Sequence, residues 1–78
     1  MVSKGLKIEL DLTGVIAPVS LLKCKSTLKT MSKGDTLTVL INDDEVIKDL
    51  TLIINRSKDS VLVVEKQDNY TSIKIMRG

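Results

Sequence analysis

Residues 6–31 read LKIELDLTGVIAPVSLLKCKSTLKTM, and the fold is most clearly indicated by this segment. Its first seven residues alternate Leu or Ile with Lys, Glu and Asp, which is the period of a strand that buries one face. Gly14 then permits a turn, and Pro18 suits the first position of a helix, where a missing N–H does no harm. We therefore predict a strand over about 6–12 and a helix over about 18–31. The helix has an apolar stripe that should face the sheet, formed by Leu21, Cys24, Leu28 and Met31.

The second half of the chain continues the alternation of strands and helices. Gly34 suits the left-handed conformation that caps the first helix, and period-two alternation resumes over residues 36–41 as a second strand. The apolar run over residues 61–64 and the alternating residues 70–76 predict two more strands. A polar connection, residues 67–69, joins them as a hairpin.

The start of the second helix has two readings. Acidic residues 43–45 are acceptable near a helix N-terminus, and apolar residues at helical spacing follow them as far as Arg56. Asp49 could instead cap a helix that begins at Leu50, leaving residues 44–48 as a separate turn. We expect the later start. N-capping is the favoured role of these acidic residues, because they lack the spacing of a calcium loop.

The order β-α-β-α-β-β predicts a single α+β domain over residues 1–78. It should form a two-layer sandwich in which two helices cover one face of a four-stranded mixed sheet. A strand, helix, strand crossover requires the first two strands to be parallel. We expect the other sheet face to be polar and to carry Lys7, Glu9, Asp11, Thr38 and Lys74.

Composition excludes several classes of function. The chain has 78 residues, a formal net charge of +2, no His and one Cys. A charge this small does not indicate nucleic acid or an anionic membrane as the main partner. Without His, the usual zinc sites and the Ser-His or Cys-His nucleophile pairs cannot form. We expect no metal, no cofactor and no membrane insertion, and a cytoplasmic protein that is a monomer or a weak homodimer.

Residues 10–23, LDLTGVIAPVSLLK, resemble the signature of the TusA family of small sulfur-carrier proteins, also called SirA-like or YedF-like. In that family a Leu-Asp, a Gly and a Cys-Pro-x-Pro precede a Leu-Leu-Lys helix. Further matches are residues 33–35 (KGD), 43–44 (DD) and 48–50 (KDL). The resemblance implies a two-layer split β-α-β fold over nearly the whole chain.

The same resemblance places Ala17 where the family has its cysteine. That cysteine accepts sulfur as a persulfide from a desulfurase and passes it on, for tRNA thiolation or sulfur metabolism. Ser20 stands at the second proline of the motif, so only Pro18 remains. The residues that the resemblance implies for the motif and for docking are Gly14, Ala17, Pro18, Ser20, Lys23 and Lys25.

Cys24 is not a relocated nucleophile in this interpretation. It lies seven residues beyond Ala17, roughly 10 Å along a helix axis. Its place on the apolar stripe indicates a buried structural cysteine.

These residues lead to one hypothesis and two alternatives. The leading hypothesis is a non-catalytic, protein-binding or regulatory member of the family, whose partner is a desulfurase-like or sulfur-relay protein. The first alternative is a sulfur carrier whose cysteine was mutated in this copy, so enzyme activity stays open. The second is an RNA-binding module for tRNA, which is weaker because no aromatic residue accompanies the lysines.

Overall fold

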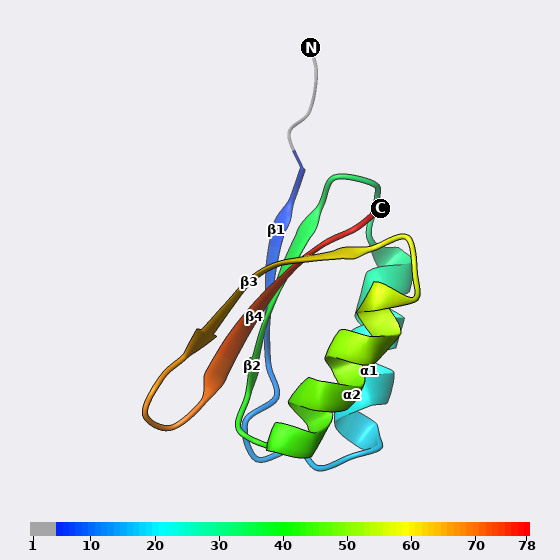
Figure 1. Cartoon of the computed structure of the whole chain (residues 1–78). Helices are drawn as coiled ribbons and strands as arrows, with labels where there is room; N and C mark the ends of the chain where they lie inside the picture. The colour runs from blue at the N-terminus through cyan, green and yellow to red at the C-terminus, as the bar shows by residue number, and fades with distance from the viewer. Residues whose placement is uncertain (1–4) are drawn as a thin grey trace.

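The sheet and the two helices form separate layers in the computed structural model, which describes residues 5–78 (Figure 1). Both helices lie on one face of the sheet, which confirms the predicted two-layer α+β fold. In chain order the elements are β1 (Lys7–Asp11), α1 (Val19–Thr30), β2 (Thr36–Ile41), α2 (Asp44–Asn55), β3 (Ser60–Lys66) and β4 (Thr71–Met76).

The strand order in the sheet is β1-β2-β4-β3. β1 runs parallel to β2, as expected for two strands joined through α1, whereas β4 pairs antiparallel with both β2 and β3. The sheet is therefore mixed, with β1 and β3 at its two edges. Among the described residues, no helix is long and apolar enough to cross a membrane.

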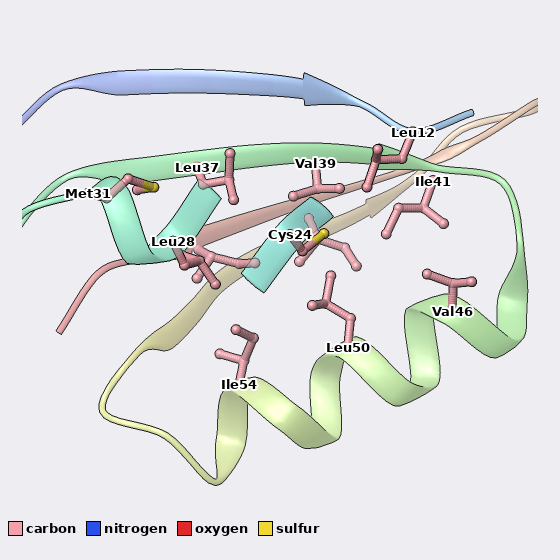
Figure 2. Close-up of a cluster of buried hydrophobic side chains, with 12 residues drawn as sticks. Leu12, Cys24, Leu28, Met31, Leu37, Val39, Ile41, Val46, Leu50 and Ile54 are labelled. Atoms are coloured by element: carbon pink, nitrogen blue, oxygen red, sulfur yellow. The ribbon is translucent and has the colours of Figure 1, made fainter. Parts of the chain in front are cut away.

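The core lies between the sheet and the helices and is aliphatic (Figure 2). The two central strands supply most of the core residues on the sheet side, because alternate residues of β2 and β4 are buried. The stripe predicted for α1 is buried at Cys24, Leu28 and Met31 and half-buried at Leu21. The largest buried side chains of the sheet and α2 are Leu37, Val39, Ile41, Ile73, Ile75, Val46, Leu50 and Ile54.

The opposite face of the sheet carries the polar residues predicted for it. Lys7, Glu9 and Asp11 are exposed on β1, and Thr38 and Lys74 are half-buried on the central strands. No helix covers this face (Figure 1).

The expected late start of α2 is wrong. α2 begins at Asp44, and its N-cap is Asp43, whose Oδ1 accepts a hydrogen bond of 3.0 Å from Glu45 N. Val46 is fully buried on the same stripe as Leu50, and burying it requires the extra turn at the front of the helix. The prediction that an acidic residue caps this helix is confirmed for Asp43. Asp49 lies within the helix and does not cap it.

Two predicted boundaries of α1 also shift. Pro18 is the N-cap and not the first helical residue, and the helix ends at Thr30 with Met31 in extended conformation. Gly34, with φ of 92°, therefore serves the turn before β2 and does not cap the helix. Gly14, with φ of 81°, lies at a turn as predicted.

Candidate functional site

The loop that carries the motif, residues 12–18, lies at the end of β1 beside the end of β2. Leu12 N donates to Leu40 O at 2.8 Å, which continues the parallel pairing one residue past β1. Gly14 N then donates to Asn42 Oδ1 at 3.0 Å. The loop is thus tied to the segment between β2 and α2.

Asp11 shapes the first turn of this loop. Its Oδ1 accepts hydrogen bonds from Thr13 Oγ1 at 2.6 Å and from Thr13 N at 3.0 Å. The side-chain hydrogen bond, followed by the backbone one, lowers the pKa of Asp11 below its ordinary value. The Leu-Asp of the motif is therefore a turn-forming element, and the ionised carboxylate stabilises the turn.

The loop leads into α1 through Ala17 and Pro18, which are both exposed. Ser20 N donates to Ile16 O at 3.1 Å and Leu22 N to Pro18 O at 3.0 Å, so helical hydrogen bonding begins within the loop. No side chain caps the helix. N–H groups and the positive dipole end of a helix stabilise a thiolate placed before it, but Ala17 offers only a methyl group.

Three exposed apolar side chains surround this entrance. Ile16 is 72% exposed, Val19 44% and Leu22 58%. Their spacing of three residues places Val19 and Leu22 on one outward side of α1, away from the buried stripe. We call Ile16, Val19 and Leu22 the α1 patch.

The structure brings together only part of the predicted docking set. Gly14, Ala17, Pro18 and Lys23 are exposed on the loop and the first half of α1. Ser20 is fully buried and its Oγ has no hydrogen-bond partner among residues 5–78, so its side chain adds nothing to a docking surface.

Lys25 belongs to a different region from the loop. Together with Lys29 and Arg77 it lines a hollow of about 150 Å³ between α1, α2 and the chain end. Lys25 and Lys23 therefore lie on different sides of α1, because a helix places residues two apart on different faces.

Cys24 is buried in the core, as predicted (Figure 2). Burial raises the pKa of its thiol to about 11. At neutral pH the thiol is therefore protonated and packed between the sheet and the helices, and a buried, protonated thiol is a poor nucleophile.

Sequence reasoning missed the α1 patch and the role of Asn42. The signal for the patch was present in the spacing of residues 16, 19 and 22, outside the apolar stripe of the helix. Asn42 offered no comparable signal, because its contact with Gly14 joins residues 28 positions apart.

Comparisons with known proteins agree with this fold and motif. The family described as sulfurtransferase TusA matches residues 8–77. Two relatives from Neisseria meningitidis, of serogroups A and B, are named as candidate sulfur carrier proteins. Each is 30% identical over 66 residues, covering 85% of this chain and 89% of the relative.

A solved structure supports the fold independently. The SirA-like protein from Desulfitobacterium hafniense superimposes with a TM-score of 0.73 at 22% identity, covering 91% of this chain and 97% of that one. With the family match over nearly the whole chain, these similarities show that the chain belongs to the TusA family of sulfur-carrier proteins.

Proposed function

We propose that this chain is a TusA-family member that binds protein partners of a sulfur relay without carrying sulfur itself. One observation carries the proposal. The residue at the entrance of α1 is an exposed alanine, while the one cysteine of the chain is buried in the core.

Sulfur transfer needs a thiolate on the acceptor. The thiolate attacks the outer sulfur of a donor persulfide, a new S–S bond forms on the acceptor, and the donor thiolate leaves. Ala17 has no such group. Cys24 is fully buried and protonated, so it cannot reach a donor without opening of the core.

The α1 patch supports a binding role. Apolar side chains clustered on the surface mark sites of protein interaction more often than isolated ones do. Here the patch borders Ala17, and Lys23 lies exposed next to Leu22. A partner with an apolar depression and an acidic rim fits this surface, and we propose a desulfurase-like or sulfur-relay protein in the cytoplasm.

RNA binding is less well supported. Single-stranded RNA is usually held by aromatic side chains stacked on bases beside basic residues. Tyr70 is the one aromatic residue of the chain and stands at the end of the β3–β4 hairpin, far in sequence from the lysines of α1. Affinity for tRNA that falls steeply with added salt would favour this alternative.

Competition for a cysteine desulfurase tests the binding role. An Ala17→Cys variant is incubated with the desulfurase, cysteine and pyridoxal phosphate, and its sulfur loading is followed by intact mass. We expect excess wild-type chain to slow the loading, because both chains present the same α1 patch. Where the variant does not load, direct binding of labelled wild type to the desulfurase gives the same information.

A matched pair of substitutions makes the test specific. Leu22→Lys in the competing chain should abolish inhibition, because it places a charge in the α1 patch. Leu52→Lys should leave inhibition intact, because Leu52 is also about half exposed (48%) but lies on α2. Failure of the wild-type chain to bind or compete would overturn the proposal. Transfer of the loaded sulfur from Ala17→Cys to a relay partner would favour the alternative of a carrier that has lost its cysteine, whereas loading alone shows only that the docking surface is intact.

A further inference from the structure

β3 has the sequence of a buried strand but the position of an edge strand. Its centre, Val61–Val64, is continuously apolar, a pattern typical of strands covered on both faces. β3 is nevertheless the outermost strand of the sheet. Leu62, Val63 and Val64 are 46%, 45% and 52% exposed.

The exposed valines lie on both faces of the sheet. Val64 pairs with Ile73, whose side chain faces the helices, and Val63 pairs with Lys74 on the open face. The β3–β4 hairpin reaches past the helical layer, so no helix covers its outer half (Figure 1). A hydrogen bond of 2.8 Å from Gln67 N to Tyr70 O closes the hairpin and extends the ladder to its end.

The two edges of the sheet differ in their protection. β1 has five residues and carries Lys7, Glu9 and Asp11, the charged and short kind of edge that resists pairing. β3 has seven residues, and its one irregularity is a bulge between Val61 and Val63. From Val63 to Lys66 the strand is regular and presents free backbone N–H and C=O groups outward.

We propose that β3 pairs antiparallel with β3 of a second copy of this chain, in a register centred on Val64, to form a two-fold dimer with a continuous eight-stranded sheet. Pairing β3 with itself closes after two copies. Pairing β3 with the β1 edge would add copies without end. The dimer goes beyond the proposed function. It leaves the α1 patch free, because the patch lies on the loop that follows β1 and on α1, and β1 and β3 are opposite edges of the sheet.

Charge favours this register. In this register Val64 lies opposite Val64 of the second copy, and Glu65 lies opposite Val63 of that copy. Because Val63 pairs with Lys74 on the next strand, Glu65 is about 10 Å, or two strand spacings, from Lys74 of the second copy. Two long side chains of opposite charge can approach each other over the smaller valine. Shifting the centre to Glu65 would place two carboxylates face to face. Within residues 5–78 the ion pair formed is Arg77–Asp59, so Glu65 has no such partner in its own copy.

Sedimentation over a range of concentrations tests the dimer. Wild type should shift from the 8.6 kDa monomer toward twice that mass as concentration rises. Val64→Lys should weaken self-association by at least about tenfold, because two ammonium groups would meet at the symmetry axis. Leu52→Lys is the control, since it replaces an equally exposed apolar side chain on α2. Circular dichroism confirms that both variants fold.

Cysteine cross-linking tests the register. Residues directly opposite in antiparallel strands have Cβ atoms about 5 Å apart, close to disulfide range, so Val64→Cys should form a covalent dimer under mild oxidation. Val63→Cys and Leu52→Cys should cross-link at least about tenfold more slowly, because neither faces its own symmetry mate. Cys24 is buried and does not compete. A wild type that stays monomeric at millimolar concentration, or equal cross-linking at positions 52 and 64, would overturn the proposal.

Discussion

A sulfur carrier needs a thiol that is exposed at the entrance of a helix, but in this chain the exposed position and the thiol belong to two different residues. Ala17 has the exposure and the place at the entrance of a helix, whereas Cys24 has the sulfur. Because Cys24 is fully buried and its pKa is raised to about 11, neither residue presents a reactive thiolate at neutral pH.

The burial of Cys24 leads to a prediction about its reactivity. In the native protein at pH 8, maleimide should label Cys24 at least about a hundredfold more slowly than a free thiol, because burial suppresses both access and ionisation. In concentrated urea the labelling should become fast. Mass spectrometry measures the extent of labelling. Rapid labelling of the native protein would contradict the placement of this thiol in the core.

Sequence reasoning predicted Cys24 correctly but did not predict that Ser20 is buried. Cys24 lies between Leu21 and Leu28, so helical periodicity alone places it inside. Ser20 is one turn before Cys24 and faces the core equally well, but a hydroxyl in the core is rarely expected from a sequence. Within the described residues its Oγ has no hydrogen-bond partner, so no polar contact explains why a hydroxyl is buried there.

At the level of single elements, two substitutions in α2 distinguish Asp43 from Asp49 as the N-cap of the helix. Asp43→Ala should destabilise the protein by about 1 kcal/mol, because it removes the acceptor for Glu45 N at the start of the helix. Asp49→Ala is the matched control and should change stability by less than about 0.5 kcal/mol, since Asp49 is exposed within the helix. Chemical unfolding measures both. A larger effect at Asp49 would restore the later helix start.

The elements themselves were largely predictable, whereas their ends were not. Alternation in residues 6–12 and 36–41 indicated strands because each has one apolar face, which is half-buried in β1 and fully buried in β2. The start of α2 was misjudged because Asp43 and Asp49 are equally good caps in sequence. The burial of Val46 against the sheet decides between them, and that contact exists only in the folded chain.

At the scale of the whole molecule, two carboxylates fasten distant segments. Asp35 accepts hydrogen bonds from Ser32 N at 2.8 Å and Leu6 N at 2.9 Å, which joins the loop before β2 to the start of β1. Asp59 accepts from Gly78 N at 2.9 Å and Arg77 Nη1 at 3.0 Å, which holds the chain end. The hydrogen bonds from Leu6 to Asp35 and from residues 77 and 78 to Asp59 join residues at least 18 positions apart, so they were not predictable from local sequence.

These carboxylates predict how stability depends on pH. Hydrogen bonds from Ser32 N and then Leu6 N lower the pKa of Asp35. For Asp59, burial acts to raise the pKa, but the hydrogen bonds from Gly78 and Arg77 and the Arg77 charge outweigh it. Since both folded-state pKa values lie below the ordinary 3.8, the stabilisation is present above that pH and is lost as pH falls through the lowered values.

The urea midpoint should therefore fall steadily once the pH drops below about 4. Asp35→Asn and Asp59→Asn should each lower the midpoint at pH 7 and flatten its acid dependence. Asp49→Asn, on the exposed side of α2, should leave the midpoint at pH 7 unchanged. An unchanged acid slope in both variants would show that other groups control acid unfolding.

We propose that this TusA-family chain holds no transferable sulfur, and the intact mass of the unaltered protein tests the proposal. After incubation with a cysteine desulfurase, cysteine and pyridoxal phosphate, we expect an intact mass equal to that of the untreated chain. A gain of one sulfur atom, removable by a thiol reductant and mapped to Cys24, would contradict it.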